Sequence, residues 1–403
     1  MKKFRSAPVS VSCYSSVTAC GVGKQPLLNM LQSNNSALKS PSLFSLPFPT
    51  YVGEIVDELP EISRRMDKFV TRNNRVALAV LNEPNEEIRM CIDSAKQRYS
   101  AARIGVVIGT STSGLYETEA AYRYFLKNGE MPADFNFLTR HAYQATARFI
   151  QLELGLKGPC YAISTACSSS AKAIAAGQRL INSGLCDAVL VGGVDTLCHL
   201  TLRGFHSLEL ISSQPCRPMD KNRCGISIGE GAALLVLEKP VSVSTDSLNF
   251  LAAGETSDAY HMSSPHPEGF GAKLAMGEAL KKAELEASDI DYINLHATAT
   301  PLNDKIEAKA ISMVFLGKTP CSGTKGVTGH TLGAAGAIEA SIALLALEHQ
   351  FIPGNVGFEQ SESDLGCHIV RDSEKDIQLQ RVMSNSFGFG GNNTSLIFSR
   401  GLN

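Results

Sequence analysis

Residues 160–184 have the sequence CYAISTACSSSAKAIAAGQRLINSG, and this stretch decides the fold class. Residues 160–164 form a short segment, mostly apolar and bounded by polar residues, which predicts a strand. The serines that follow are good helix N-caps, and the run of small residues 169–183 before Gly184 predicts a helix. A strand that passes through a tight turn into a helix is the repeating unit of α/β proteins.

The same alternation continues on both sides of this unit. It predicts an α/β fold with a mainly parallel sheet and helices on the faces of that sheet. Residues 33–49 and 214–229 are expected to be loops, and a soft boundary is expected near residues 239–247, where Pro, Ser and Thr cluster. The other expected elements are strands over residues 9–13, 104–108, 188–194, 232–238, 292–296 and 395–398, and helices over residues 304–314 and 334–348.

The composition is that of a soluble globular enzyme, with 403 residues, of which 44% are apolar and 19% charged. At roughly 150 residues per domain, the length allows two or three domains or one large duplicated fold. A formal net charge of −2 argues against broad electrostatic binding of nucleic acid, which needs a basic surface. No run approaches ~20 consecutive apolar residues, so a membrane span is not expected.

The 11 cysteines are scattered and lack the CxxC spacing of zinc sites. This usage is typical of reduced cytosolic thiols, most of them small buried side chains. The basic start Met1-Lys2-Lys3 could open a signal peptide, but no continuous apolar run follows it. Residues 9–13 alternate between apolar and polar instead, as in a half-buried strand. We therefore expect a cytoplasmic protein.

Cys167 is the first candidate catalytic residue, because it would lie between the strand and the helix of the opening unit. The helix dipole and the free N–H groups there would stabilise a thiolate and lower its pKa. The same N–H groups could hold a developing oxyanion. A buried structural cysteine is the alternative, and we favour that interpretation for the other cysteines.

Two histidines occupy comparable positions in the C-terminal part. Residues 295–304, LHATATPLND, place His296 at the end of a strand, where open parallel sheets bind ligands. Residues 325–339, KGVTGHTLGAAGAIE, place His330 between glycines at the start of an Ala-rich helix. The alternatives are solvated loop histidines and, for the second stretch, a close-packed helix or a phosphate loop, whose spacing is not met.

Two further features belong with these motifs. Glu339 lies inside the Ala-rich helix, where a buried carboxylate would need a cationic partner, and Lys325 is a candidate. Residues 385–393, NSFGFGGNN, are dense in glycine, which permits unusual backbone angles and close approach to a ligand. A plain turn before the last strand is the alternative for that stretch.

One cysteine and two histidines, each near the end of a strand or helix, together suit thioester chemistry. A thiol is a soft nucleophile that can accept an acyl group. Neutral imidazoles can polarise a carbonyl or exchange a proton with it.

In these motifs the sequence resembles the β-ketoacyl–acyl carrier protein synthases, condensing enzymes of the thiolase superfamily. The resemblance covers nearly the whole chain, from residues 17–21, VTACG, to Phe398. It implies a duplicated, thiolase-like five-layered α-β-α-β-α fold, normally in a dimer. We expect an N-terminal half, residues 1–245, with the nucleophile, and a C-terminal half, residues 246–403, with both histidines.

The resemblance also implies a role for each motif residue. Cys167 matches the nucleophile. His296 and His330 match the two histidines that bind the malonyl thioester and assist its decarboxylation. Lys325 and Glu339 match a lysine and a glutamate whose roles are partly structural.

The implied reaction is a decarboxylative Claisen condensation, in which malonyl carrier protein extends an acyl chain held on Cys167. Phe389 matches the gating phenylalanine, whose N–H forms the oxyanion hole with the N–H of Cys167. The resemblance implies no metal or redox cofactor. Acyl-loaded and malonyl-loaded carrier proteins are acidic, so a local basic patch is expected. Arg64 and Arg65 resemble the family's basic docking segment, with a solvated helix face as the alternative.

Some positions depart from the enzymes of fatty-acid elongation. Residues 297–300 are ATAT where GTST is usual, and two serines follow Cys167 as in polyketide-type synthases. Thr112 occupies a position where an apolar residue often controls chain length. These differences favour a specialised synthase, of the aryl polyene or another type II polyketide sort.

Three alternatives share part of the pattern. A non-catalytic chain-length partner has the same fold but lacks the nucleophile, although this chain could form a heterodimer with such a subunit instead of a homodimer. A biosynthetic thiolase has a second cysteine, which is missing from residues 385–393. A cysteine hydrolase would need a base poised to activate water.

Overall fold

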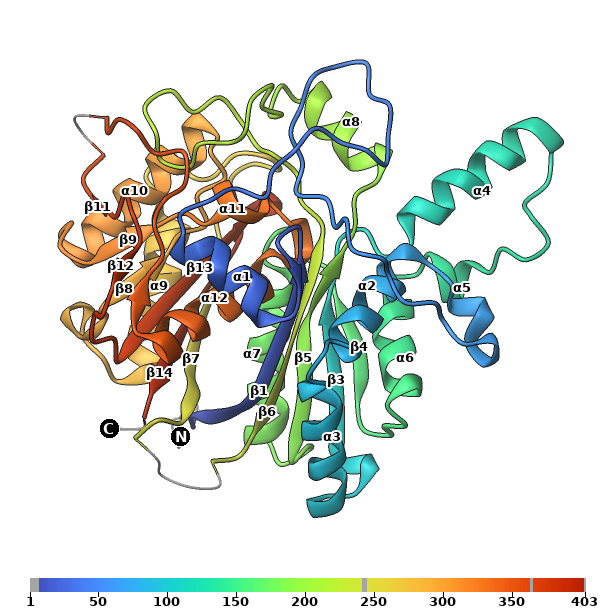
Figure 1. Ribbon diagram of the computed structural model, residues 1–403. Coiled ribbons are helices and arrows are strands. Elements are labelled where there is room, and N and C mark those ends of the chain that lie inside the picture. Colours follow the sequence, from blue (N-terminus) through green and yellow to red (C-terminus); the bar gives the residue numbers. More distant parts are fainter. Residues whose placement is uncertain (1–6, 241–244, 363–364, 402–403) are drawn as a thin grey trace.

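The computed structural model describes residues 7–240, 245–362 and 365–401 (Figure 1). Its main sheet has twelve strands in the order β11-β9-β8-β13-β14-β7-β1-β6-β5-β3-β4, and β2 pairs with β1. The first six strands are β1 (Val9–Thr18), β2 (Gly21–Val22), β3 (Ile104–Gly109), β4 (Cys160–Ile163), β5 (Ala188–Asp195) and β6 (Gly231–Glu238). The others are β7 (Leu248–Ser257), β8 (Tyr292–Asn294), β9 (Pro320–Ser322), β11 (His368–Ile369), β13 (Arg381–Gly388) and β14 (Asn392–Arg400), while β10 (Phe351–Ile352) and β12 (Glu374–Lys375) pair separately.

The sheet consists of two halves with the same topology. The strand order is β4-β3-β5-β6-β1 in the first half and β9-β8-β13-β14-β7 in the second, so each of these strands has a counterpart, and β2 and β11 are additions. The pairing directions also match. In each half-order the first two pairs, β4/β3 and β3/β5 or β9/β8 and β8/β13, are parallel, and the last two pairs are antiparallel. The halves meet where β1 pairs with β7. The duplicated fold implied by the resemblance is therefore confirmed.

Helices cover both outer faces of the sheet and fill the space between its halves. In the middle, α7 (Ser169–Asn182) and α12 (Ala335–His349) contact each other and strands of both halves. The outer layers are α2 (Arg72–Leu81), α3 (Glu87–Arg98) and α6 (Gln144–Glu153) on one side and α9 (Phe270–Ala283) and α10 (Pro301–Phe315) on the other, which gives five layers. The remaining helices are α1 (Lys24–Gln32), α4 (Leu115–Asn128), α5 (Phe137–Arg140), α8 (His199–Ser207) and α11 (Lys325–Thr328), and α4 projects from the body of the molecule (Figure 1).

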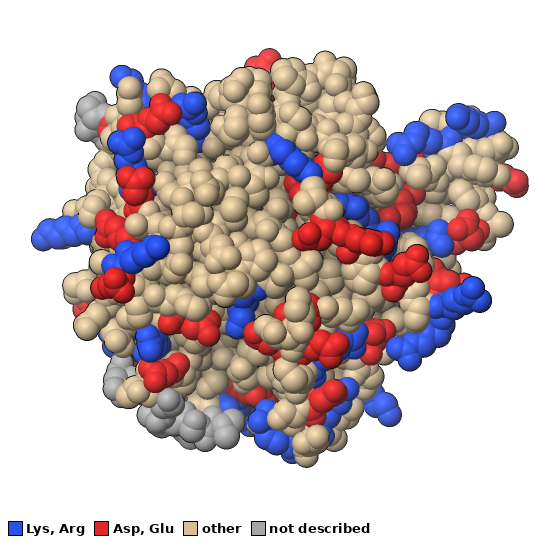
Figure 2. Space-filling view, in the orientation of Figure 1, with Lys and Arg blue, Asp and Glu red and all other residues tan. Residues whose placement is uncertain are grey.

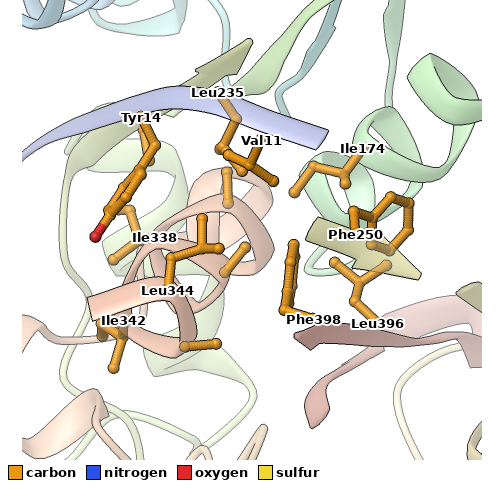
Figure 3. Close-up of a cluster of buried hydrophobic side chains, with 14 of the residues drawn as sticks. Val11, Tyr14, Ile174, Leu235, Phe250, Ile338, Ile342, Leu344, Leu396 and Phe398 are labelled. Carbon is orange, nitrogen blue, oxygen red and sulfur yellow. The ribbon is translucent and has the colours of Figure 1, made fainter. Parts of the chain in front are cut away.

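Three hydrophobic cores correspond to these layers. In β3, Val107 belongs to the central core, whereas Val106 and Ile108 belong to the outer core of the N-terminal half. Figure 3 shows the central core, in which Phe250 lies near Ile174 of α7 and its ring packs against that of Phe398, with centroids 5.3 Å apart. Strands that bury both faces need apolar residues at every position, which explains the continuous apolar runs in the sequence.

The expected elements within the described residues are present, with shifted ends, but the prediction of a mainly parallel sheet is wrong. The pairs β1/β6, β5/β6, β1/β7, β7/β14 and β13/β14 are antiparallel, so the sheet is mixed. A strand with helices on both faces is apolar throughout whichever way it runs, so the pattern does not record direction. Residues 385–393 are more than a turn, since β13 extends to Gly388 and only Phe389–Gly391 make the turn to β14.

The most apolar helix lies at the centre of the fold. The segment Leu332–His349 is long and apolar enough to cross a membrane, but 89% of it is buried inside the protein, as in a core helix. Residues 1–3, part of the predicted boundary region at 241–244, and the chain end at 402–403 lie outside the described residues. The division into halves at residues 245 and 246 stays a prediction.

Candidate active site

Cys167 lies between β4 and α7, as the sequence predicted, and only 6% of its surface is exposed. Ala166 before it has a φ of 52°, in the left-handed region that is strained for a residue with a side chain. Ser169 Oγ accepts from the N–H of Thr165 and donates to the carbonyl of Ala166, which holds this turn. The strained backbone thus makes a sharp turn at Cys167, between the end of β4 and the start of α7.

The predicted lowering of the thiol pKa is wrong for the resting site. Burial raises the pKa of Cys167 to about 11, although Lys325 and the backbone N–H groups of Phe389 and Cys167 act in the opposite direction. A helix N-terminus stabilises a charge by about 1 kcal/mol or less at most sites, and removing a thiolate from water outweighs that. The thiol is therefore protonated at neutral pH and has to lose its proton during the reaction.

Both histidines lie beside the thiol. His330 Nε2 is 3.0 Å from Cys167 Sγ, and the rings of His296 and His330 are nearly perpendicular, with centroids 5.4 Å apart. Burial, together with the nearby ammonium of Lys325, lowers the pKa of each imidazole well below its usual value. Both rings are therefore neutral at pH 7 and can each donate one hydrogen bond and accept another.

The same three residues have the donor set of a soft-metal site. One donor atom from each of Cys167, His296 and His330 lies within 4.8 Å of the other two. The protonated thiol and the ammonium of Lys325 beside the pair of imidazoles both oppose a divalent cation there. We therefore interpret the three side chains as groups that transfer protons and form hydrogen bonds.

The loop after β8 that carries His296 is held by a buried carboxylate. Glu307 of α10 accepts hydrogen bonds from the N–H groups of His296 and Ala297, at 2.8 and 2.7 Å. Ala297 and Ala299 have positive φ angles of 32° and 65°, which L-residues adopt only at a cost of about 1–2 kcal/mol each. Burial raises the pKa of Glu307 to about 8. The carboxylate thus stabilises the strained backbone that presents the imidazole.

Lys325 and Glu339 form a buried ion pair next to His296. The ammonium of Lys325 donates to a carboxylate oxygen of Glu339 and to the backbone carbonyl of His296, and it lies 3.4 Å from Nδ1 of that imidazole. Lys325 is thus the cationic partner expected for Glu339. Burial raises the pKa of Glu339 to about 7, although Lys325 favours the charged form.

Replacing Lys325 with Met should destabilise the protein in a pH-dependent way. At pH 8 we expect a loss of about 3–5 kcal/mol in the free energy of unfolding, because Glu339 would be left as a buried unpaired charge. The folded-state pKa of Glu339 lies above its unfolded value of 4.5, so the folded state binds the extra proton and stability falls as the pH rises through about 7. The loss in the variant should therefore be smaller at pH 5.5. Urea unfolding at the two pH values measures it.

A double variant provides the control for this prediction. Lys325→Met combined with Glu339→Gln removes both charges and should recover most of the lost stability at pH 8. An equal loss for the single variant at both pH values would contradict the buried-charge explanation.

Two backbone N–H groups converge on the thiol. The N–H of Phe389 and that of Cys167 both stabilise the sulfur. Gly388 permits this approach, since a Cβ there would lie 3.2 Å from the backbone nitrogen of Cys167. The ring of Phe389 lies against that of Phe205, with centroids 5.6 Å apart. Two backbone N–H groups beside one sulfur can both donate to an anion that forms there.

A cavity of about 330 Å³ opens onto Cys167 and the two histidines. This volume is within the range of pockets that bind small molecules. The wall combines apolar side chains with hydroxyl and amide groups, so it can accommodate a molecule with an apolar part and a hydrogen-bonding part. The apolar residues include Phe205, Leu208, Leu210, Ile226 and Leu302, and the polar ones include Ser263, Thr298, Thr300 and Asn303.

Sequence reasoning missed the residues that hold the site in place. Asp195, at the end of β5, is fully buried and accepts hydrogen bonds from the N–H groups of Ser111, Thr112 and Gly333. It therefore joins the loop after β3 to the turn that follows His330. An acidic residue at the end of a buried strand was the signal that could have identified it. Glu307 and Phe205 gave no local signal, because their neighbours come from distant parts of the chain.

Arg64 and Arg65 lie apart from the catalytic cluster. They begin the 3₁₀ helix η1 (Arg64–Phe69), both are exposed, and neither lines the cavity. Arg65 lies 3.3 Å from Glu153 with 71% of its side chain exposed, which is an ion pair of small energetic value. Figure 2 shows charges of both signs interspersed on one face of the molecule, without a broad basic area.

Two family models match this chain. The model described as "Beta-ketoacyl synthase, N-terminal domain" matches residues 44–241, and "Beta-ketoacyl synthase, C-terminal domain" matches residues 249–359. The first contains Cys167, and the second contains both histidines together with Lys325 and Glu339.

Curated proteins and solved structures give the same result. The chain is 33% identical to 3-oxoacyl-[acyl-carrier-protein] synthase 2 of Vibrio cholerae, over 84% of each chain. It is 32% identical to the protein of that name from Staphylococcus aureus, over 84% of this chain and 83% of the other. The structure of the ketosynthase ApeO, in complex with its chain length factor ApeC from Xenorhabdus doucetiae, matches with a TM-score of 0.89 and 38% identity and covers 99% of both chains.

Proposed function

The chain belongs to the β-ketoacyl synthase family of condensing enzymes, and on that premise we propose that it extends an acyl chain held on Cys167 with a unit from malonyl carrier protein. The contact of 3.0 Å between Cys167 Sγ and His330 Nε2, with the second neutral imidazole beside it, carries this proposal. A nucleophile and two uncharged donors are what the reaction needs, because it passes through an enolate.

The first step transfers the acyl group from the carrier thiol to Cys167. The sulfur attacks the thioester carbonyl, whose oxygen becomes an anion held by the N–H groups of Cys167 and Phe389. The S–H proton passes from the sulfur to His330 Nε2, and His330 passes a proton on to the departing carrier thiolate, so the ring is neutral before and after the step. Because burial raises the pKa of the free thiol to about 11, we expect proton loss to accompany the attack and not to precede it.

The second step removes CO₂ from the malonyl thioester. The bond between the carboxylate carbon and the α-carbon breaks, and its electron pair passes into an enolate. Lys325 fixes the tautomer of His296, since an ammonium can only donate, so Nδ1 of the imidazole accepts and Nε2 carries the proton. In this arrangement His296 offers its Nε2–H to the enolate oxygen. After Cys167 is acylated, the thiol proton is gone, and His330 offers a second N–H in the tautomer that carries its proton on Nε2.

The third step forms the new carbon–carbon bond. The enolate carbon attacks the acyl carbonyl on Cys167, and the oxygen again becomes an anion beside the same two N–H groups. Collapse of this intermediate expels the Cys167 thiolate, which takes up the one proton that the net reaction consumes, delivered from solvent through His330. The product is a β-ketoacyl chain on the carrier, two carbons longer than the starting chain.

The reaction is tested by its products. The enzyme is mixed with an acyl carrier protein thioester and malonyl carrier protein labelled with ¹³C in the free carboxylate. The proposal expects labelled CO₂ and an elongated β-ketoacyl carrier in equal amounts. Free fatty acid without elongation would indicate a cysteine hydrolase instead.

A non-catalytic chain-length subunit is not favoured for this chain, because Cys167 and both histidines are present and in contact. We propose that the chain pairs with a second ketosynthase-like chain. Strand β4 ends the sheet and is contacted by α6, on which α5 packs, followed by α4. Helices α4 and α5 expose several large apolar residues, among them Tyr122, Leu126, Phe137 and Leu138. A chain-length partner is supported by the complex reported for ApeO, and a homodimer is the other form.

The pathway and the cellular location also stay proposals. We propose a specialised fatty-acid or polyketide pathway of the aryl polyene type, which is supported by the 38% identity to ApeO over nearly its whole length. We propose that the enzyme works in the cytoplasm, which is supported by its cysteines, because all eleven are free thiols.

We propose that Arg64 and Arg65 help to dock the acidic carrier protein. Reversing both charges, Arg64→Glu with Arg65→Glu, should raise KM for the acyl carrier protein about tenfold and leave kcat unchanged, since the change weakens encounter and not chemistry. The effect should shrink at high salt. Lys281→Glu, an exposed charge reversal on α9, is the matched control. An unchanged KM in the double variant would mean that η1 is only a solvated surface.

A further inference from the structure

Lys172 is an unexpected charge in the first part of α7. It is the only charged residue from Ser169 to Gln178 and is half-buried, and its Nζ donates to Oδ1 of Asn392 at 3.0 Å. Burial lowers the pKa of its ammonium, partly offset by Glu255. Burying a cation and ordering a long side chain both cost free energy, and the hydrogen bond to Asn392 offsets part of that cost.

The hydrogen bond joins the two chain segments that supply the N–H groups beside the thiol. Lys172 is five residues after Cys167, in the helix that begins next to the nucleophile. Asn392 is the first residue of β14, directly after the turn Phe389–Gly391. The N–H of Phe389 beside the Cys167 sulfur and the Lys172–Asn392 bond are therefore two links between the start of α7 and this turn.

The opposite side of the turn is held by an exposed loop. The N–H of Gly390 donates to the carbonyl of Met262 at 2.8 Å, and the N–H of Asp258 donates to the carbonyl of Gly391 at 2.9 Å. Met262 is 78% exposed, so this support lies at the protein surface. Lys172 instead ties the turn to a central helix of the fold.

We propose that Lys172 is a positioning residue, which acts through Asn392 to fix the N–H of Phe389 relative to the N–H of Cys167. This inference rests on the proposed function, in which the two N–H groups stabilise the thioester oxyanion. Preorganised donors lower the barrier because they need no rearrangement as the charge develops. Without Lys172, the turn can move away from α7, and acyl transfer slows although carrier binding does not change.

The test compares Lys172→Met with Lys172→Arg in the full-length enzyme with its partner chain. Methionine keeps much of the length of the side chain without the donor, and arginine restores a donor. We expect Lys172→Met to lower kcat for acyl transfer about tenfold, with KM for the acyl carrier unchanged, because misplaced donors lose transition-state stabilisation. Lys172→Arg should recover most of that rate.

A spectroscopic measurement separates positioning from a general loss of structure. The carbonyl stretch of a ¹³C-labelled acyl group on Cys167 is recorded by difference infrared spectroscopy, where stronger hydrogen bonds to the carbonyl lower its frequency. The frequency should rise in Lys172→Met and return toward the native value in Lys172→Arg. Lys281→Met, the same replacement at an exposed site of α9, should leave both the rate and the frequency unchanged.

Two outcomes would overturn the inference. One is an unshifted carbonyl band in Lys172→Met. The other is an additive loss of rate when Lys172→Met is combined with Asn392→Ala, because two substitutions that break the same hydrogen bond should not have additive effects. Failure of the proposed function gives a different result, since the wild-type enzyme would then show no acyl carbonyl band at all.

Discussion

Replacing Cys167 with Ala should abolish condensation, with a fall on the order of 10⁴-fold or more in rate, as for other enzymes that lose their nucleophile. In the proposed mechanism the Cys167 sulfur holds the acyl chain while malonyl carrier protein binds. Cys167→Gln should also stop condensation, yet it leaves the two imidazoles in place to stabilise an enolate. Decarboxylation of malonyl carrier protein should therefore continue in that variant, as measured by release of labelled CO₂.

Cys186→Ala is the matched control for the nucleophile. Cys186 is another buried free cysteine, which packs in the central core and does not line the cavity. It should keep full condensation activity. Condensation by either Cys167 variant above a trace level would refute the assignment of the nucleophile.

The two histidines should separate acyl transfer from decarboxylation. Within the described residues, His296 lies next to Lys325 and has no hydrogen bond to the thiol, so His296→Ala should acylate at nearly the native rate and lose decarboxylation by about 10²-fold or more. His330 Nε2 lies 3.0 Å from Cys167 Sγ, so His330→Ala should lose decarboxylation to a similar extent and also acylate more slowly. Single-turnover acylation and CO₂ release measure the two steps independently.

His349→Ala, an exposed histidine at the end of α12, should change neither step. Equal acylation rates in His296→Ala and His330→Ala would contradict the role of His330 in accepting the thiol proton. Normal decarboxylation in either variant would contradict the proposed enolate site.

Much of the fold could be predicted because its signals are local. The unit of β4, the turn at Cys167 and α7 follows from a short apolar run, a cluster of N-capping serines and a run of small residues. The motifs around His296 and His330 could be located in the same way, since each follows the end of a strand or precedes a helix. These patterns depend on residues near in sequence, and such signals survive without knowledge of the tertiary structure.

The features that could not be predicted depend on contacts between segments far apart in the sequence. The sequence placed Cys167 at a helix N-terminus but could not show that burial would raise its pKa. The antiparallel direction of β6 and β14 left no trace in their apolar runs. Asp195 and Glu307 bond to backbone N–H groups of other loops, and because any backbone offers such groups, the sequence does not reveal these partners.

The central claim is that Cys167 carries the acyl chain between the two carrier proteins, and intact-protein mass spectrometry tests it most directly. The enzyme is mixed with a panel of saturated, polyunsaturated and aryl carrier thioesters, and malonyl carrier protein is then added. The account predicts a mass gain equal to one acyl group, located on Cys167, that disappears on addition of malonyl carrier protein as an elongated product forms. An acyl group on another residue, or one that malonyl carrier protein does not remove, would contradict it.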